Sequence, residues 1–445
     1  MKTPLILAAA LLLAAAPGAQ AAGWKQVTAP GGSNIDQISP VRTADGVLHV
    51  AWKKGGDLFH TAIGPDGKLR ATSPIATGWA STSDPALTAV PGGLRAIWGG
   101  IRSTEATETN QDQNTAFSSD GGATWALQVG STVPIGAQAY ASDTAASTAP
   151  DGTTYTTWFG TAGTWVHAGL DPALPNFNYQ AAGYGNDSNL ASDASGTTML
   201  AWFSDTPPGI FVQPVGAGGA PGGGALQMPG TNVMVGGPEL SRTPIVARPK
   251  SGGFYVARAV GYPTSDQVRV WKVGTGSTIL LDKTRNSAET AISADAKGRL
   301  WVAWSDSEFG DQHVLVARSN PEATEFGAAV DAGAVKGAHS LYTLDISGTS
   351  SGADVFGVFG TQDDSSASTF VTRVLPGLSL AAKRAKDNVT FTVTDAGDPV
   401  KGATVKAGGK SGKTNAQGRV VLTLKSKTAS RATASGYEPA SLKAR

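Results

Sequence analysis

The chain of 445 residues has no cysteine, five histidines and almost no net charge. The absence of cysteine excludes a disulfide framework, a thiolate metal site and a cysteine nucleophile. The histidines show no ligand spacing, so the sequence predicts no histidine metal site and no resident cofactor. A formal net charge of +1, from 35 Lys and Arg against 34 Asp and Glu, argues against a protein that binds nucleic acid along its whole length.

Long apolar runs are also missing. After the first 22 residues no stretch approaches the 18 apolar residues that a membrane-spanning helix needs. The apolar run Leu5 to Ala16 follows Lys2 and precedes a small-residue cleavage site, Ala19-Gln20-Ala21. We therefore expect residues 1–21 to be a signal peptide. The remaining chain is expected to be secreted, extracellular or at the cell surface, and its Ala- and Gly-rich composition is typical of a bacterial protein.

A short apolar segment ending in an aromatic residue recurs along the chain. Its closing positions are 52, 98, 158, 202, 258, 304 and 359, and the two weaker copies end in Arg258 and Phe359. A Gly-containing turn precedes each copy and another short β-type segment precedes each turn, as in a β-hairpin. Three or four strands in every ~50 residues predict an all-β fold, a β-propeller over residues 22–378. Seven blades fit best, with six blades and a stacked array of β-sandwiches as alternatives. We expect Trp24 to Val27 to complete the last blade near residues 369–375.

One hairpin carries a motif. The residues Ser118-x-Asp120-x-Gly122-x-Thr124-Trp125 place a carboxylate where it can accept turn N–H groups, a glycine at positive φ and a tryptophan under the hairpin. This pattern resembles the Asp box of the sialidase-like, BNR-repeat propellers. The resemblance covers the blade architecture over residues 24–378 and implies a structural hairpin on an outer strand.

The catalytic set of the sialidases has no counterpart here. Those enzymes use three arginines that bind the substrate carboxylate, a tyrosine nucleophile with its glutamate, and an aspartate acid/base. Their first arginine lies in a Phe/Tyr-Arg-Ile/Leu-Pro segment, whereas Arg42 follows Pro40-Val41 and Arg242 precedes Thr243-Pro244. The resemblance therefore assigns no catalytic residue to this chain.

A second regularity appears when the repeats are aligned on their turn glycines. An acidic residue stands nine or ten positions before the turn in five repeats, and the fifth repeat has Arg242 there and Arg258 as its closing residue. In the seventh repeat Asp345 stands only seven positions before Gly352, so it is not equivalent to these acidic residues. Because the first strand of each blade lines the central channel, these residues are expected to converge on one rim. The predicted rim consists of Asp36, Asp84, Asp143, Asp187, Arg242, Arg258 and Glu289.

Two interpretations of this rim remain open. The acids can satisfy turn backbone groups and bridge neighbouring blades, which is the structural interpretation. They can also bind a polar or cationic ligand, including Ca²⁺, or act as a general acid and base pair. An acid repeated in most blades favours the structural interpretation, and the arginine-bearing fifth repeat is the exception.

The composition changes after residue 378. Residues 379–445 alternate short β-type segments with Gly turns and predict a small β-sandwich. The segment Pro399-Val-Lys-Gly-Ala-Thr-Val405 and the closing Gly436-Tyr437 resemble carboxypeptidase-regulatory-like and bacterial Ig-like modules, which implies a spacer or adhesion role. This region holds 13 Lys and Arg against 4 Asp and Glu, whereas residues 22–378 hold 21 against 30. The small total charge is thus a cancellation, and the tail is expected to lie on anionic cell-envelope polymer.

These features support three functional hypotheses. The first is non-catalytic binding of a glycan or another cell-surface partner by the propeller. The second is a sialidase-like exo-glycosidase, or another glycan-active hydrolase or lyase, that uses the rim carboxylates. The third is a structural surface protein.

Overall fold

The computed structural model describes residues 23–28, 38–105, 112–128, 142–160, 163–171, 173–179, 185–232, 242–249, 252–261, 264–284, 287, 289–308, 311–361 and 367–444. The predicted signal peptide and Asp36 lie outside these residues. Strands and two short 3₁₀ turns, Ser103–Glu105 and Ala217–Gly219, make up the regular structure of the described residues. None of their helices is long and apolar enough to cross a membrane.

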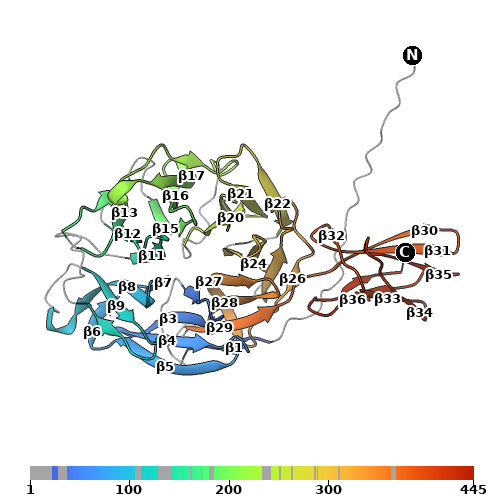
Figure 1. The fold of residues 1–445 in the computed structure, drawn as a ribbon, viewed down its shortest axis with the longest axis horizontal. Helices are drawn as coiled ribbons and strands as arrows, with labels where there is room; N and C mark the ends of the chain where they lie inside the picture. The colour runs from blue at the N-terminus through green and yellow to red at the C-terminus, as the bar shows by residue number, and fades with distance from the viewer. Residues whose placement is uncertain are drawn as a thin grey trace, which may run out of the picture.

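Up to residue 374 the described strands form seven antiparallel sheets, which surround a common centre in Figure 1. We number them by position. Sheet 1 holds β2 (Ser39–Arg42), β3 (Leu48–Lys54), β4 (Asp57–Ile63) and β5 (Leu69–Ala76). Sheet 2 holds β6 (Trp79–Thr82), β7 (Ala86–Val90), β8 (Gly93–Arg102), β9 (Asp112–Ser118) and β10 (Ala126–Leu127). Sheet 3 holds β11 (Ser142–Thr148), β12 (Thr154–Gly160), β13 (Gly163–Ala168) and β14 (Phe177–Asn178).

The next four sheets repeat this order. Sheet 4 holds β15 (Gly185–Ser192), β16 (Thr198–Asp205), β17 (Pro208–Val215) and β18 (Leu226–Gln227). Sheet 5 holds β19 (Ile245–Ala247), β20 (Phe254–Val260), β21 (Gln267–Lys272) and β22 (Thr278–Lys283). Sheet 6 holds β23 (Thr290–Ala294), β24 (Leu300–Glu308), β25 (Asp311–Arg318) and β26 (Val330–Asp331). Sheet 7 holds β27 (Ala338–Thr349), β28 (Gly352–Thr361), β29 (Ala367–Val374) and β1 (Lys25–Gln26).

The strand β1 joins the two ends of this arrangement. It pairs antiparallel with β29, with Lys25 opposite Val371 and Gln26 opposite Phe370. The Val27 N–H donates to the Thr369 carbonyl at 2.8 Å. The expectation that the first strand completes the last sheet is therefore confirmed.

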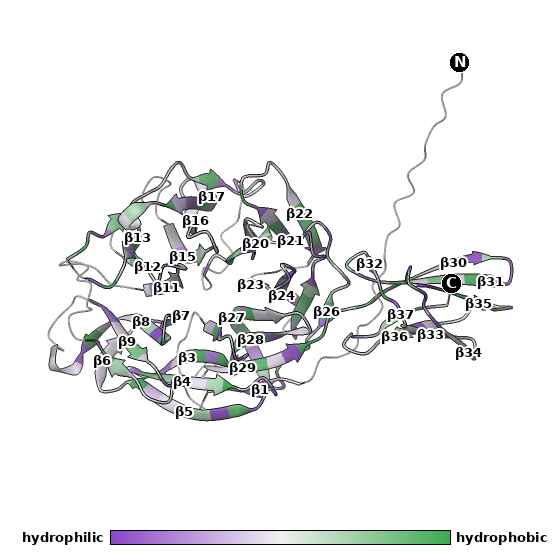
Figure 2. Ribbon diagram, viewed as in Figure 1, coloured by the Kyte–Doolittle hydropathy of each residue, from purple (hydrophilic) through white to green (hydrophobic). Residues whose placement is uncertain are grey.

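The core of the ring is divided among neighbouring sheets. Hydrophobic clusters are shared by sheets 1 and 2, 3 and 4, 4 and 5, 5 and 6, 6 and 7, and 7 and 1. The repeated tryptophans lie inside, with Trp98, Trp158, Trp202 and Trp304 all fully buried. Figure 2 shows hydrophobic residues in strands all round the ring. Strands that pack side to side around a centre, without an α-helix among the described residues, give a β-propeller-like all-β fold.

The chain after residue 378 forms two further sheets beside the ring (Figure 1). Sheet 8 contains β30 (Ser379–Ala385), β31 (Asn388–Asp395), β32 (Asp398–Pro399) and β35 (Arg419–Thr423). Sheet 9 has the order β34 (Lys410–Lys413), β33 (Thr404–Ala407), β36 (Ser430–Thr433) and β37 (Ala440–Leu442). Side chains of both sheets share one hydrophobic cluster, centred on Phe391, Val393, Ala403 and Val405.

Buried ion pairs connect this C-terminal module to sheet 6. The Asp395 carboxylate, 3% exposed, accepts from the guanidinium of Arg318, and Arg299 Nη1 lies 3.7 Å from its Oδ2. Arg299 Nη2 also reaches Asp398 Oδ2 at 2.7 Å. Because buried charges need partners, these contacts fix the module against the ring.

Candidate functional site

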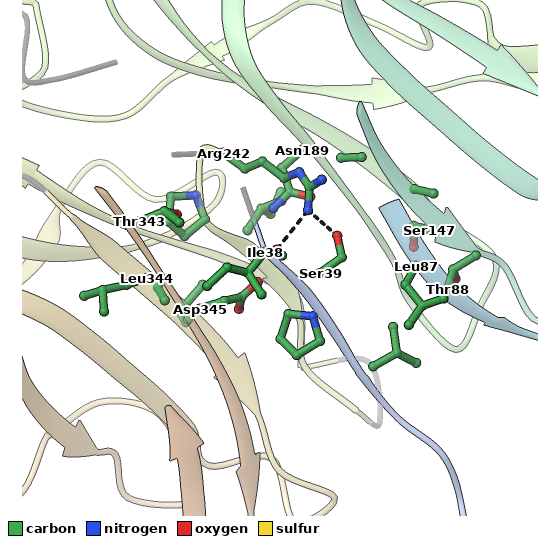
Figure 3. Close-up of a pocket in the computed structure, with 18 of the residues that line it drawn as sticks. Ile38, Ser39, Leu87, Thr88, Ser147, Asn189, Arg242, Thr343, Leu344 and Asp345 are labelled. Carbon is green, nitrogen blue, oxygen red and sulfur yellow. Dashed lines mark hydrogen bonds between the residues drawn. The ribbon is translucent and has the colours of Figure 1, made fainter. Parts of the chain in front are cut away.

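The innermost strands of the seven sheets line a central cavity. It has a volume of about 300 Å³, and β2, β7, β11, β15, β19, β23 and β27 all contribute to its wall. Much of that wall is polar but uncharged, as Figure 3 shows for Ser39, Thr88, Ser147, Asn189 and Thr343. Some hydroxyls also bond to one another, such as Thr88 Oγ1 to Thr148 Oγ1 at 3.0 Å. The cavity therefore offers many groups that can both donate and accept hydrogen bonds.

Arg242 is one of the residues that line this cavity. Its Nη1 donates to the Ile38 carbonyl at 3.1 Å and to Ser39 Oγ, as drawn in Figure 3. Its Nη2 donates to the carbonyls of Pro85, at 3.4 Å, and Thr144. Since these acceptors lie where the inner strands of sheets 1, 2 and 3 begin, one side chain from sheet 5 crosses the channel. Most donors of the guanidinium are used by the backbone, so the predicted rim arginine ties sheets together as well as lining the cavity.

Asp345 provides a carboxyl group in the same cavity (Figure 3). Burial raises the pKa of Asp345 to about 7, although the Ile346 N–H at 2.6 Å and the charge of Arg242 oppose the increase. A raised pKa favours the protonated carboxyl, which can donate a hydrogen bond as well as accept one.

Asp84 and Asp143 lie close enough to Arg242 to act on its charge. Burial lowers the pKa of Arg242, and the negative charges of Asp84, Asp345 and Asp143 oppose that decrease. Asp84 is buried and lies 3.3 Å from Lys53 Nζ. Asp143 Oδ2 accepts from Ser142 Oγ at 3.2 Å. Both belong to the electrostatic surroundings of Arg242, although neither lines the cavity itself.

The other predicted rim residues form a separate buried cluster. Asp187, Arg258 and Glu289 are each 1–3% exposed and none of them lines the central cavity. Burial raises the pKa of Glu289 to about 8, Arg258 opposes this increase, and Asp187 adds to it. Glu289 Oε2 has no hydrogen-bond partner among the described residues. The acids and arginines aligned in the sequence thus separate into two groups, one around Arg242 and one around Arg258.

The backbone explains why aspartate recurs at two of these positions. Asp143 and Asp187 have φ angles of 53° and 52°, in the left-handed region. Each lies in a β-bulge, where the pairing of β11 with β12 and of β15 with β16 shifts register. Aspartate tolerates this conformation better than most residues, because its short polar side chain can bond locally. This geometry supports the structural interpretation for both residues.

Ca²⁺ coordination has little support in this geometry. No group of three or more His, Cys, Asp or Glu side chains in the described ranges is arranged to hold a metal ion. Asp36, a predicted rim acid, lies outside those ranges. The described carboxylates instead interact with Lys53, Arg242 and Arg258.

The hairpin between β9 and β10 makes the bonds expected from its sequence. Asp120 Oδ1 accepts from Ser118 Oγ at 2.8 Å and from the Thr124 N–H at 3.0 Å, and its Oδ2 accepts from Thr124 Oγ1 at 2.6 Å. Gly122 has a φ of 87°, and Trp125 Nε1 donates to its carbonyl at 3.1 Å. These bonds lower the pKa of Asp120 well below its usual range. The motif is therefore a turn held largely by its own residues, on the outer part of sheet 2 and away from the channel, and its Gly122 carbonyl also accepts from Ser73 Oγ of sheet 1.

A buried histidine pair lies under this hairpin. His49 Nδ1 and His60 Nε2 are 3.0 Å apart, and a β-carbon on Gly122 would lie 2.1 Å from the His60 ring. Burial lowers the pKa of both rings, that of His60 to about 4. Residue spacing alone does not indicate this contact, because the pairing of the adjacent strands β3 and β4 brings the two rings together.

Comparisons with known protein families and with curated protein sequences give no match. Among solved structures, the chain is similar to a protein of unknown function from Dyadobacter fermentans, with 10% identity, a TM-score of 0.43, and coverage of 79% of this chain and 99% of that chain. It is also similar to a GH43_1 enzyme from Xanthomonas citri, with 12% identity, a TM-score of 0.36, and coverage of 81% and 91%. A puromycin hydrolase S511A mutant complexed with PGG has 14% identity, a TM-score of 0.44, and coverage of 93% and 62%. Similarity at this level assigns neither a family nor an activity.

Proposed function

We propose that this chain is an exported bacterial protein whose central channel binds a glycan. In this proposal residues 1–21 are a signal peptide, residues 22–378 form a seven-bladed propeller and residues 379–445 form an Ig-like sandwich. The seven sheets around one centre and the pairing of β1 with β29 support the closed ring. The shared hydrophobic cluster of sheets 8 and 9 supports the sandwich.

The observation that carries the proposal is the hydroxyl-rich wall of the channel cavity. Saccharides present many hydroxyl groups that both donate and accept, and serine, threonine and asparagine side chains can match either role. Thr88, Ser147, Asn189 and Thr343 supply such groups from four different sheets. The Thr290 hydroxyl already donates to the Ala257 carbonyl at 3.2 Å. A volume of about 300 Å³ lies at the lower end of the range for ligand pockets. The ligand segment inside the channel is accordingly short.

Asp345 is the group that would fix the orientation of this segment. It is the described carboxyl that lines the cavity, and Arg242, whose donors are largely used by backbone carbonyls, holds it in a positive field. A carboxylate that accepts from a sugar hydroxyl makes a charge-assisted bond, which is stronger than a neutral one. Its loss should therefore weaken binding measurably.

Glycan hydrolysis is the second candidate function, and one observation favours it. Burial raises the pKa of Asp345 to about 7, and Asp84 and Asp143 act on the charge of the same arginine. General acid and base catalysis uses two carboxyl groups whose environments separate their pKa values, and the raised pKa of Asp345 supplies one such group. The sialidase resemblance adds no residue to this candidate.

The test is a glycan array probed with the mature protein, followed by calorimetry and turnover assays on the hits. We expect binding without turnover, and we expect Asp345→Asn to weaken it by about tenfold or more, as for loss of a hydrogen bond to a charged group. Asp66→Asn is the matched control, because Asp66 is an exposed acid of sheet 1 far from the channel wall. It should leave the affinity unchanged.

The other outcomes separate the candidates. Turnover that Asp345→Asn, Asp84→Asn or Asp143→Asn abolishes would replace the binding function with hydrolysis. Binding that Asp345→Asn leaves intact would place the glycan outside the channel and contradict the proposal. An array without hits would favour a structural role at the cell surface.

A further inference from the structure

Sheet 9 has one face packed on the module core and one face in solvent. Val405, Ala407 and Ala432 point inward and are buried. The alternate positions point outward, and we call them the basic face: Thr404, Lys406, Ser411, Lys413, Arg431, Thr433 and Ser441. Among these, Lys406, Lys413 and Arg431 are exposed.

The charges on this face repel one another. Lys406 lies directly opposite Arg431 in the pairing of β33 with β36, and Lys413 faces the neighbouring position, Thr404. The four strands contain no Asp or Glu. Like charges directly opposite each other destabilise a sheet, so the folded module contains a repulsion that nothing in sheet 9 relieves.

Protection of the sheet edge does not explain these residues. Lysines on an edge strand prevent pairing with other chains, and this accounts for Lys410 and Lys413 on the edge strand β34. Lys406 and Arg431, however, lie on β33 and β36, the two central strands of sheet 9. Their backbone groups are already paired, so their charges need another explanation.

The acids of the module lie elsewhere. Asp395 and Asp398 pair with Arg299 and Arg318 of sheet 6, and the backbone of Glu438 bonds to the segment that joins ring and module. The contact with the ring thus uses two of the four carboxylates of the module, Asp395 and Asp398. The basic face keeps a positive field with no counter-charge of its own.

We propose that the basic face binds an anionic polysaccharide, independently of the glycan proposed for the channel. Cations separated by the hydroxyls of Thr404, Ser411, Thr433 and Ser441 match a polymer whose anionic groups alternate with sugar hydroxyls. The face has no aromatic side chain on which a nucleic-acid base could stack. It also has no large apolar side chain to insert into a lipid surface. The polysaccharide is therefore the occupant that the face fits.

The experiment compares the full mature protein with Lys406→Gln/Arg431→Gln. The probes are polygalacturonate and dextran sulfate, with neutral dextran, single-stranded poly(dT) and phosphatidylglycerol vesicles as the other arms. The matched control is Lys68→Gln/Lys336→Gln, which removes the same charge from exposed positions of the ring. We expect the face variant to weaken polysaccharide binding by roughly 30-fold and the control variant by less than about twofold.

Two further readouts make the result specific. Binding should fall as salt is added, and the melting temperature of the face variant should stay equal or rise, because the repulsion is removed. If both variants lose the same affinity for polysaccharide, the net charge of the protein and not the basic face accounts for binding, and the proposal is overturned. Absence of polysaccharide binding, or tighter binding to poly(dT) or vesicles, would overturn it as well. Asp345→Asn should leave this binding unchanged, so the two proposals can fail separately.

Discussion

The buried histidine pair predicts a specific dependence of stability on pH. His49 and His60 are both neutral in the folded chain, since burial lowers their pKa values, and that of His60 falls from 6.5 to about 4. A group whose folded pKa lies below its unfolded value contributes stability above the unfolded pKa. That contribution is lost as the pH falls from 6.5 towards 4, because the unfolded chain takes up the proton first.

The size of the effect follows from the shift. For His60 the difference between 6.5 and about 4 corresponds to roughly 3 kcal/mol at full protonation. About 2 kcal/mol of this is lost between pH 7.5 and pH 5. The ring is 1% exposed and lies against Ser73 Oγ, at 3.4 Å, and His49, so burial leaves little solvent to hydrate a charge.

The assay is urea unfolding at both pH values, followed by tryptophan fluorescence. All 11 tryptophans precede residue 305, so the signal reports on the ring and not on the C-terminal module. Glu289 and Asp345 have raised pKa values and act in the opposite direction, which makes the raw dependence of the wild type uninformative. The comparison is therefore between wild type and His60→Gln, which share these carboxyls. The wild type should lose about 2 kcal/mol more than the variant.

His313→Gln is the control, since His313 is exposed and lies 3.2 Å from Asp331 at the surface. It should keep the pH dependence of the wild type. If His60→Gln keeps it too, the buried pair is not the origin of the effect and the reasoning is refuted.

Two further predictions concern the rim and the hairpin. A carboxyl whose pKa is raised in the folded state makes the protein less stable as the pH rises from 4.5 towards 8, and Glu289→Gln should remove this cost. In the same urea assay the free energy of unfolding of the wild type should fall by about 3 kcal/mol more than that of the variant between pH 5 and pH 7.5. Equal losses in the two proteins would contradict the assignment. Gly122→Ala should destabilise the ring by about 1–3 kcal/mol more than Gly121→Ala, since both glycines have positive φ but only the first has the His60 ring against its missing β-carbon. Thermal melts of the two variants measure this difference, and equal melting temperatures would show that the hairpin moves away without cost.

The repeated turns and tryptophans were sufficient to predict the sheets. A glycine at positive φ before an apolar strand, as at Gly46, Gly152, Gly196 and Gly298, marks a hairpin through local geometry alone. The pairing of β1 with β29 was also predictable, because a ring of sheets needs its ends joined. Both inferences depend on rules that act over a few residues or on the closure of the ring as a whole.

The candidate site was harder to predict, and bulges are one reason. Counting residues back from a turn assumes unbroken pairing, but the pairing shifts register at Asp143 and Asp187, so neither residue follows the strand geometry that the count assumes. In β27 the pairing from Asp345 to Gly352 is unbroken, and Asp345 lines the cavity from a position nearer to its turn than the other acids. The length of the arginine side chain is a second reason. Arg242 reaches backbone carbonyls at the inner strands of three other sheets. An alignment of the repeats cannot predict such contacts, because it compares positions within a blade and not distances across the channel.

The pairing of β1 with β29 also sets the order in which the ring can form. Lys25 and Val371 are neighbours in space, yet almost the whole ring separates them in sequence. Forming such a contact fixes a very long loop, so it gains most when the intervening sheets are already in place. The N-terminus is synthesised first, so β1 has no partner until the other strands of the seventh sheet have formed. Until β1 pairs with it, β29 leaves that sheet with an open edge. The closing pair therefore forms only when both ends of the ring are present, and a chain that lacks either end leaves a strand without its partner.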